Sequence, residues 1–456
     1  MTERFDAIIV GAGQAGPPLA GRLTAAGQKV AVIERKLVGG TCVNYGCIPT
    51  KTLVASAHTA HVARRAAEYG IGTGDVTVDM AKVKARKDKI SGDDRHGLES
   101  WLGGMDNCEL IYGHARFENP HALRIDDRLI EADRIFLNTG GRAVVPEIRG
   151  LADIDYLTNV SILELDRVPE HLVIIGGSYI ALEFAQMYRR FGARVTVVEK
   201  GPRLTSREDE DVSATIKEIL EAEGIDVVLG ATNMRFIKQD KGFDLIPRDG
   251  AAPITGSDVL LAVGRRPNTD DLGLENAGVE TDQRGYVKVD DQLRTTVEHI
   301  WAMGDCNGKG AFTHTSYNDF EIVAGNLLDD DPRRVSDRVP TYALYIDPPL
   351  GRAGLTVDEV RKSGRKALVG KRPMTRVGRA VEKGETQGFM KVVVDAETKE
   401  ILGAAILGVG GDEVIHSILD VMTAKLPYTA ISRTMHIHPT VSELVPTMLQ
   451  ELTPLE

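Results

Sequence analysis

The sequence predicts an α/β fold in which two similar strand–turn–helix units are followed by a C-terminal α+β region. The chain has 456 residues, 42% of them hydrophobic, which is enough for about three domains of ordinary size. An apolar run leads into a glycine-rich turn twice, at the same internal spacing. Near the C-terminus, two apolar runs at 390–394 and 401–406 are typical of strands and precede helical segments.

The first unit begins with the apolar run 5–10, which is typical of a buried parallel strand. Gly11, Gly13 and Gly16 follow with the spacing G-x-G-x-x-G. In this pattern the three glycines permit a tight turn, a close approach of the backbone to a pyrophosphate, and packing of the next helix on the strand. Glu34 ends the next strand and could accept hydrogen bonds from a ribose. The unit therefore predicts a bound dinucleotide.

The second unit repeats these landmarks 165 residues later, since 176 − 11, 192 − 27 and 199 − 34 all equal 165. The run 172–175 leads to Gly176, and Glu199 occupies the position of the earlier acid. Ser178 and Ala181 stand where the second and third glycines would be. Two dinucleotides are thus expected, and the second is expected to sit less deeply or bind more weakly.

The composition and charge of the chain argue against a secreted, a membrane-spanning and a nucleic-acid-binding protein. Four cysteines are too few for a secreted disulfide framework, and the first residues lack the pattern of a secretory signal, so a cytoplasmic location is expected. The chain contains no apolar run of about 18 residues, which argues against a membrane-spanning helix. The net charge of −11 argues against nucleic acid as the main partner.

Two cysteines, Cys42 and Cys47, lie close together just after the first unit. At the start of a helix, two such residues can come within disulfide reach with some distortion, and a short strained loop makes a reducible disulfide. A helix N-terminus and a nearby cation would each lower a thiol pKa. Two other interpretations of the two cysteines stay open at this point. They could be a pair of buried thiols, or half of a zinc site, although no further ligands lie nearby in the sequence. No metal ligand is assigned.

Taken together, these segments resemble the class I pyridine nucleotide-disulfide oxidoreductases, the group that includes lipoamide dehydrogenase, glutathione reductase and mercuric reductase. The resemblance rests on the cysteine segment 39–51, on segments 295–305 and 436–443, and on two turns at 139–140 and 263–268. It extends over nearly the whole chain, and the order and spacing of the segments make it specific.

The resemblance implies an α/β architecture of two Rossmann-like dinucleotide-binding domains, for FAD and NAD(P), and a C-terminal α+β dimerisation domain. Residues 1–150 with 268–336 are expected to bind FAD, residues 151–267 to bind NAD(P), and residues 337–456 to form a homodimer. The implied cofactor contacts are Gly11, Gly13, Gly16, Glu34, Gly40, Thr41, Lys51, Thr139, Gly140, Gly176, Ser178, Ile180, Glu199, Gly264, Gly304 and Asp305.

The resemblance also implies a redox relay, in which NAD(P)H reduces FAD and FAD reduces a Cys42–Cys47 disulfide. By analogy Cys47 is the charge-transfer thiol beside the flavin, and Cys42 is the interchange thiol that attacks the acceptor. A thiolate nucleophile needs a base, and His438 fits because imidazole titrates near working pH. Glu443 would orient His438, and the dimer would lend both residues to the other subunit.

Two further residues complete the implied catalytic set. Lys51 resembles the family lysine near the flavin, where a positive charge favours the reduced flavin, and a buried lysine needs a partner. Glu183, just after the second glycine turn, matches that partner. The nucleotide is expected to be NADH because a carboxylate at Glu199 would repel a 2′-phosphate, although Lys200 and Arg203 could compensate for NADPH.

The sequence leaves the electron acceptor open. Tyr45 and the segment 50–53 look like the mercuric-reductase-like branch, which includes flavoproteins associated with resistance to reactive chlorine. The last cysteine is Cys306, so the C-terminal cysteine pair of true mercuric reductase is missing. We therefore expect a metal ion or a small disulfide as acceptor, and thiolates favour soft metals. Dihydrolipoamide dehydrogenase is the alternative, glutathione reductase fits less well, and a plain diaphorase or a low-turnover flavin redox sensor stays open. Cys108 has no assigned role, and His436 is expected to be structural.

Overall fold

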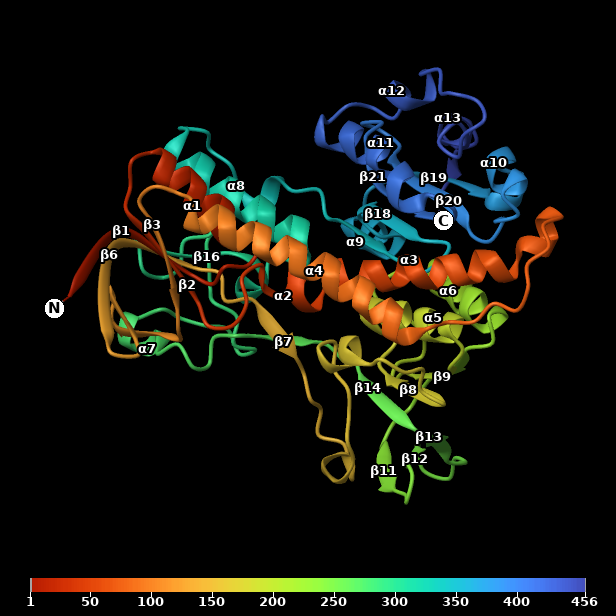
Figure 1. Ribbon diagram of the computed structural model, residues 1–456. Helices are drawn as coiled ribbons and strands as arrows, with labels where there is room; N and C mark the ends of the chain where they lie inside the picture. The colour runs from red at the N-terminus through yellow and green to blue at the C-terminus, as the bar shows by residue number, and fades with distance from the viewer. Residues whose placement is uncertain (1, 456) are drawn as a thin grey trace.

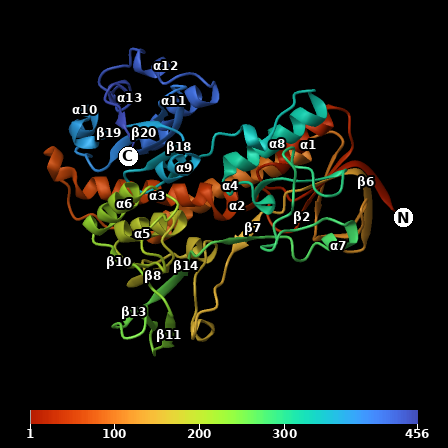
Figure 2. The same ribbon diagram turned by 180° about the vertical axis from the view of Figure 1, so that it is seen from behind.

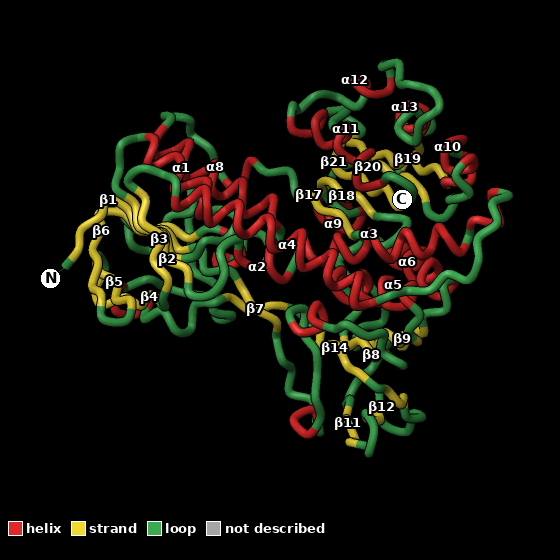
Figure 3. Tube along the Cα trace, viewed as in Figure 1, coloured by secondary structure: helices red, strands yellow, loops and turns green. Residues whose placement is uncertain are grey.

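The computed structural model describes residues 2–455 and contains three main sheets, arranged around two long helices (Figure 1). The N-terminal sheet is mixed, because β4, β5 and β6 pair antiparallel, the second sheet is parallel, and the C-terminal sheet is antiparallel. The long helices are α3 (Cys47–Arg64) and α4 (Met80–Gly103). Figure 3 shows by its colours that helices cover the upper face of the N-terminal sheet and run through the middle of the molecule.

The N-terminal sheet has the strand order β3-β2-β1-β6-β5-β4, and β16 pairs with the end of β6. Alternate residues of β1 face opposite sides of the sheet: Ala7 and Ile9 pack under α1, α4 and α8, whereas Ile8 and Val10 pack into the core on the other face. Burial on both faces explains why this strand is a continuous apolar run. The elements are β1 (Glu3–Val10), α1 (Gly16–Ala25), β2 (Val30–Glu34), α2 (Gly40–Tyr45), β3 (Cys108–Tyr112), β4 (Ala115–Asn119), β5 (Ala122–Ile125), β6 (Arg128–Leu137), α7 (Leu274–Ala277), β16 (Ile300–Ala302) and α8 (Thr313–Leu328).

The second sheet is parallel, has the order β10-β9-β8-β14, and repeats the parallel pairing of β1 with β2 in the pairing of β8 with β9. Ala7 pairs with Val30 in the first sheet, and Leu172 pairs with Val195 in the second, so the 165-residue repeat of the sequence is also a repeat of strand register. A small antiparallel sheet, β11-β12-β13, lies beside it. The elements are β8 (His171–Ile175), α5 (Tyr179–Phe191), β9 (Arg194–Val198), α6 (Glu210–Ala222), β10 (Asp226–Val228), β11 (Arg235–Lys238), β12 (Phe243–Ile246), β13 (Ile254–Gly256) and β14 (Asp258–Leu261).

Two short strands connect these two parts of the chain. β7 (Gly141–Ala143) leads toward the second sheet and β15 (Arg265–Pro267) returns from it, and the two pair as an antiparallel ladder in which Ala143 faces Arg265. The turns that resemble domain crossings therefore lie side by side.

The C-terminal sheet is antiparallel, with the order β17-β18-β21-β20-β19-β22. The expected strands at 390–394 and 401–406 are present as β20 and β21, followed by helices. Each of the three main sheets takes its strands from one of the three expected residue sets, while the domain limits themselves stay a prediction. The elements are β17 (Thr341–Leu344), β18 (Leu350–Gly354), α9 (Val357–Ser363), β19 (Ala367–Pro373), α10 (Gly378–Glu382), β20 (Phe389–Asp395), β21 (Ile401–Leu407), α11 (Gly411–Thr423), α12 (Thr429–Ser432), α13 (Leu444–Met448) and β22 (Thr453–Pro454).

One hydrophobic core joins the three parts where α3 lies between α5 and the C-terminal sheet, as the view from behind also shows (Figure 2). Leu53 of α3, Leu182 of α5 and Leu407 of β21 all belong to it. The helix that begins at Cys47 is thus held by all three parts. None of the helices within residues 2–455 is long and apolar enough to cross a membrane.

Candidate active site

The first glycine turn connects β1 to α1 and closes against the end of β6. Gly11 has a φ of +106°, and a Cβ placed on it would lie 2.3 Å from the carbonyl oxygen of Asn138. The Asn138 side chain donates a hydrogen bond of 3.2 Å to the Gly11 carbonyl. No side chain could be accommodated here, which explains the glycine and leaves the N-terminus of α1, at Gly16, facing the turn.

The backbone around this turn suits a dinucleotide such as FAD. A Cβ on Gly40 would lie 2.9 Å from the Cα atom of Gly13, so two backbone segments approach each other with no side chain between them. The Glu34 carboxylate, at the end of β2, accepts a hydrogen bond of 3.0 Å from the Ala12 N–H. Bare backbone, a helix N-terminus and an acid are the groups that suit a pyrophosphate and a ribose.

Side chains from distant segments also meet beside α2, which carries Thr41. Arg265, the residue after Gly264, donates a hydrogen bond of 3.3 Å to the Thr41 hydroxyl. Its Nε lies 3.5 Å from a carboxylate oxygen of Asp305. Burial raises the pKa of Asp305, and the charge of Arg265 opposes that rise. The Gly304 N–H donates a hydrogen bond of 2.7 Å to Asp319. Asn268 holds the neighbouring turn, because its side chain and its backbone N–H donate hydrogen bonds of 2.9 Å to the carbonyl oxygens of Thr139 and Gly140.

The second glycine turn has the same geometry as the first. Gly176 has a φ of +118°, and a Cβ on it would lie 2.4 Å from the carbonyl oxygen of Ala262. Ser178 is exposed and precedes the first residue of α5, Ile180 is exposed beside it, and Ala181 is fully buried. Ala181 therefore serves the packing role of the third glycine, while Ser178 and Ile180 face the solvent side of the turn.

Glu199 follows β9 at the place equivalent to Glu34. One of its carboxylate oxygens accepts a hydrogen bond of 2.7 Å from the Gly201 N–H, which curls the following loop back toward the acid. Lys200 is exposed, and Arg203 donates to the carbonyl oxygen of Ser206.

The two cysteines lie on consecutive helices. Cys42 is half-buried in α2, and Cys47 is exposed and begins α3. Both are free thiols, and they share a hydrogen bond that lowers the pKa of Cys47 and, together with burial, raises the pKa of Cys42. The Thr313 hydroxyl, 3.1 Å from the Cys47 sulfur, and the charge of Lys51 also lower the pKa of Cys47. The arrangement therefore favours ionisation of Cys47 over that of Cys42.

Lys51 and Glu183 are brought together as expected. The Lys51 Nζ lies 2.5 Å from a carboxylate oxygen of the buried Glu183, and 4.5 Å from the centre of the Tyr345 ring. The other Glu183 oxygen accepts a hydrogen bond of 3.0 Å from the Tyr345 N–H. One acid of α5 thus connects the cysteine helix to the C-terminal part.

His438 and Glu443 also form a pair, but far from the cysteines of their own chain. The His438 Nδ1 lies 2.9 Å from a Glu443 oxygen, and the His438 side chain is 81% exposed. The pair lies between α12 and α13, on the side of the C-terminal part that faces away from α2 in Figures 1 and 2. His436 has a structural contact, since its Nδ1 lies 2.8 Å from the Ser442 carbonyl oxygen.

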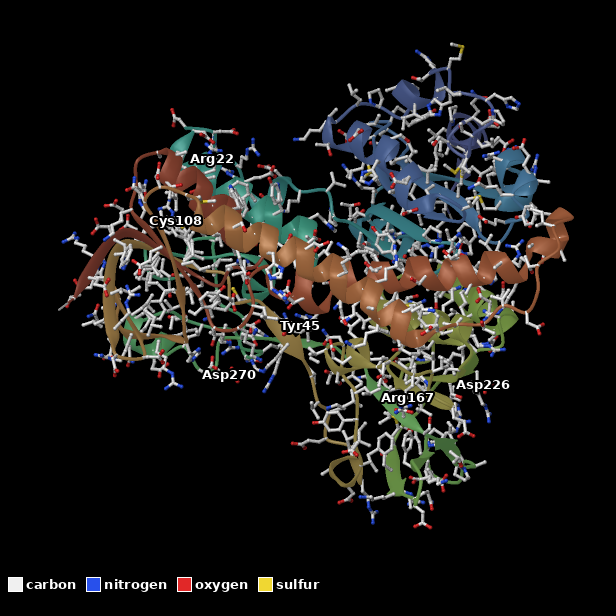
Figure 4. All side chains as sticks on the ribbon, in the orientation of Figure 1. Arg22, Tyr45, Cys108, Arg167, Asp226 and Asp270 are labelled. Atoms are coloured by element: carbon white, nitrogen blue, oxygen red, sulfur yellow. The ribbon has the colours of Figure 1, made fainter. Side chains whose placement is uncertain are left out.

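The remaining cysteines lie outside this site. Cys108 is half-buried at the start of β3, away from Tyr45, which marks the cysteine loop in Figure 4. Cys306 is fully buried, and its sulfur contacts backbone carbonyl oxygens. Sequence reasoning did not single out four residues that shape the site: Asn138, Arg265, Thr313 and Tyr345. Two of these had a signal: Arg265 lies within the crossing segment 263–268, and Tyr345 begins the segment 345–350, which resembles the mercuric-reductase-like branch.

Comparison with known proteins agrees with this geometry. Residues 5–319 match the pyridine nucleotide-disulphide oxidoreductase family, and residues 340–449 match the dimerisation domain of the same family. The family is one of oxidoreductase flavoproteins, and membership implies FAD and a pyridine nucleotide.

Three relatives illustrate the range of the family. The probable pyridine nucleotide-disulfide oxidoreductase RclA of Escherichia coli is 37% identical over 97% of this chain and 98% of its own. Its structure as a Cu(II) complex, described as an HOCl-induced flavoprotein disulfide reductase, superposes with a TM-score of 0.90 at 35% identity over 99% of each chain. A mercuric reductase of Streptomyces lividans is 33% identical, with coverage of 98% and 96%. A dihydrolipoyl dehydrogenase of Haloferax volcanii is also 33% identical, with coverage of 96% and 94%.

These matches run through both glycine turns, the cysteine helix and the C-terminal sheet. The chain therefore belongs to the pyridine nucleotide-disulphide oxidoreductase family and resembles, within it, RclA and the mercuric reductases.

Proposed function

We propose that the protein is an NADH-dependent flavoprotein reductase that passes two electrons through Cys42 and Cys47 to a metal ion, with Cu(II) as the acceptor of choice. The observation that carries the proposal is the pair itself: an exposed Cys47, with its pKa lowered by the Cys42 hydrogen bond, beside a half-buried Cys42, with its pKa raised by that same bond. Thiolates prefer soft and borderline metal ions over hard ones. A similar protein binds Cu(II), which supports the choice of ion.

The domain assignment follows the sequence. Residues 1–150 with 268–336 would hold FAD, residues 151–267 would hold the nicotinamide nucleotide, and residues 337–456 would form the dimer. FAD held there would supply the two-electron chemistry that links the reduced nicotinamide to the Cys42–Cys47 disulfide. Gly11, Gly13 and Gly40 would leave room for the pyrophosphate, and Lys51 would hold a positive charge near the flavin.

The chain's own residues then handle thiols and protons. Reduction of the disulfide takes up two electrons and one proton and gives the Cys42 thiol and the Cys47 thiolate. Two Cu(II) ions then take one electron each, the proton leaves Cys42, and the disulfide forms again. Thr313 stabilises the Cys47 thiolate by donating a hydrogen bond to its sulfur.

Cys42 needs a base because its pKa is raised by its hydrogen bond to Cys47 and by burial. We assign that base to His438 of a second copy of the chain, with Glu443 holding the imidazole in place. The segment around His438 supports a homodimer with shared sites, since Met435 is 96% and Ile437 78% exposed. Large apolar side chains this exposed are typical of a surface that another chain covers.

A second candidate function is that of a dihydrolipoamide dehydrogenase. The His438–Glu443 pair favours it, because exchange between a dithiol and a small disulfide requires proton transfer at each sulfur. In that case dihydrolipoamide would give two electrons to the Cys42–Cys47 disulfide and leave as the oxidised disulfide. The reverse direction would reduce lipoamide with NADH.

The deciding experiment is steady-state oxidation of NADH by the purified FAD-loaded protein, with Cu(II), Hg(II), lipoamide and glutathione disulfide as acceptors and NADPH in parallel. The proposal expects turnover with Cu(II) that disappears in Cys42→Ser, while reduction of a dye acceptor persists. Rapid turnover with lipoamide and none with metal ions would instead establish the second candidate. Metal-dependent turnover that survives Cys42→Ser would exclude the dithiol as the route of the electrons.

A further inference from the structure

A buried acid, Glu208, lies between the second nucleotide-binding unit and the C-terminal sheet. It is 1% exposed, and one of its oxygens, Oε1, accepts hydrogen bonds from the Tyr342 hydroxyl, which is in very close contact, and from the Tyr179 hydroxyl at 3.3 Å. Tyr342 belongs to β17, and Tyr179 is the first residue of α5, directly after the second glycine turn. Glu208 is absent from the relay derived above.

An arginine of the C-terminal sheet stabilises the negative charge of Glu208. The Arg352 guanidinium, itself buried, lies 3.9 Å from the second Glu208 oxygen and donates a hydrogen bond of 3.1 Å to Asp209. Burial raises the pKa of Glu208, and the charge of Arg352 is the strongest opposing influence. Burying an acid costs free energy, and this acid holds two tyrosine hydroxyls at one oxygen. We therefore look for a role of Glu208 in the position of these tyrosines.

A line of contacts leads from Tyr342 to the redox-active pair. The Tyr342 ring stacks on Phe312, with centroids 5.5 Å apart and planes 15° apart. Phe312 immediately precedes α8, whose first residue, Thr313, lies with its hydroxyl 3.1 Å from the Cys47 sulfur. The position of Thr313 on Cys47 therefore depends on where the Phe312 ring is held.

The Tyr179 ring packs against both Tyr342 and Phe312. Its centroid lies 5.4 Å from that of Tyr342 and 6.2 Å from that of Phe312. Three aromatic rings thus pack against each other, and two of them are held by the same carboxylate oxygen. A single acid fixes the aromatic cluster between the second glycine turn and the cysteines.

We propose that Glu208 is a positioning residue for the redox-active pair: it holds Tyr342 against Phe312 and thereby keeps the Thr313 hydroxyl on the Cys47 sulfur. This inference rests on the proposed role of Cys47 as the resting thiolate. Glu208 touches neither the thiols nor a substrate, so its effect must pass through Thr313.

The test measures the ionisation of Cys47 itself. In the reduced FAD-loaded protein carrying Cys42→Ser, the rate of alkylation of Cys47 by iodoacetamide is followed against pH by peptide mass spectrometry. Thr313→Val is expected to raise the apparent pKa of Cys47 by about 1 unit, because it removes a hydrogen bond to an ionised acceptor. Tyr342→Phe and Glu208→Gln are each expected to raise it by about 0.5 unit, as a partial loss of the same bond.

The decisive comparison is the double variant. If Glu208 acts through Thr313, Tyr342→Phe and Glu208→Gln produce no further shift in the Thr313→Val background. A shift that remains in full there, or an unchanged pKa in both single variants, would overturn the proposal. Tyr342→Phe keeps the ring and loses only a hydroxyl, so it decides the matter even where Glu208→Gln does not fold.

Tyr188→Phe is the matched control. Tyr188 is another buried tyrosine of the same part of the chain, and its hydroxyl donates a hydrogen bond of 2.9 Å to the Ile162 carbonyl, remote from Phe312. Tyr188→Phe should leave the pKa of Cys47 unchanged. A shift as large as that of Tyr342→Phe would mean that any loosening of the core changes the pKa of Cys47. Alkylation requires no NADH and no acceptor, so a protein that proves inactive as a reductase still gives a clear answer.

Discussion

The Lys51 ammonium group lies 2.5 Å from the Glu183 carboxylate, and the same carboxylate holds the backbone of Tyr345. A buried acid from α5 is thus bound at once to the cysteine helix and to the start of the C-terminal part. The pair lies in the core region where all three parts of the molecule meet.

Glu183→Gln should reduce both stability and turnover. It removes the charged partner of Lys51 from a buried position, and loss of such a hydrogen bond costs about 1–3 kcal/mol of unfolding free energy. Urea unfolding of the FAD-loaded protein measures this. Asp133→Asn is the control, because the Arg4–Asp133 ion pair is fully on the surface and its loss should change the unfolding free energy by less than about 0.5 kcal/mol. Equal effects of both variants would contradict the role of the buried pair.

Cys47 should remain reactive at a pH where ordinary thiols are protonated. Its pKa is lowered by the hydrogen bond from Cys42, by Thr313 and by the charge of Lys51, so the thiolate persists as the pH falls below about 8.5, the value of a free cysteine. Burial raises the pKa of Cys108, so that thiol should become unreactive over the same range. Alkylation of the reduced protein at pH 7, mapped by mass spectrometry, compares the two directly. Lys51→Met should raise the pKa of Cys47, and a rate at pH 7 that is no faster for Cys47 than for Cys108 would show that its thiol is not ionised.

His438→Ala should slow reduction of the acceptor by about 10²–10⁴-fold if His438 is a general base. His436→Ala is the paired control, because His436 contacts only the backbone at Ser442 and should leave the rate within a few fold. Mixing inactive His438→Ala chains with inactive Cys42→Ser chains should restore part of the activity, because one site of the mixed dimer then carries both an intact pair and an intact base. Failure of the mixture to recover activity would contradict the shared site.

His58 should stabilise the fold only at mildly acidic pH. A hydrogen bond from His58 to Asp347, 2.8 Å long, raises the pKa of His58, and hydrogen bonds from His58 and Arg190 keep the pKa of Asp347 low against the effect of burial. The contribution of His58 is therefore fully present below about pH 6.5 and is lost as the pH rises through its raised pKa. His58→Ala should lower the urea midpoint more at pH 6 than at pH 9. His96→Ala, at an exposed position of α4, should show no such difference, and a loss for His58→Ala that is equal at both pH values would rule the interaction out.

Glu199 should select NADH over NADPH. A carboxylate at the end of β9 accepts from a 2′-hydroxyl and repels a 2′-phosphate, so Glu199→Ala should raise the ratio of kcat/KM for NADPH to that for NADH by about 10-fold or more. Glu210→Ala, at an exposed position at the start of α6, changes the net charge equally and should leave the ratio unchanged. An unchanged ratio in Glu199→Ala would assign the preference to other residues, of which Arg203 is the first to test.

The local parts of this site could be predicted from the sequence. The turns at Gly11 and Gly176 and the Cys42–Cys47 loop are each contained in a short segment, and their spacing reflects geometry within one strand, one turn and one helix. The equal register of β1 with β2 and of β8 with β9 follows for the same reason.

Contacts between distant segments could not be predicted in this way. Thr313 reaches Cys47 across 266 positions, and Arg265 reaches Thr41 across 224. Such contacts depend on how three parts of the chain pack around α3, and a single hydroxyl or guanidinium in a loop carries no periodic signal. Glu208 could not be predicted for the same reason. It lies in a charged segment, which predicts a solvent-exposed side chain, and it is buried only because the C-terminal sheet packs against it.

The pairing of β7 with β15 has a consequence for how the molecule could be taken apart. Because Ala143 and Arg265 face each other in one ladder, the chain leaves and re-enters the part built on the N-terminal sheet at neighbouring points, and a short hairpin could replace residues 144–264 without moving either end. The part built on the second sheet is thus a covalent insertion that could be excised. Its side chains, however, pack as part of the whole molecule, since α5 shares a core with Leu53 of α3 and Leu407 of β21. Excision would expose that apolar surface to water, so this part of the chain can be cut out at its two connections but its removal would destabilise the rest.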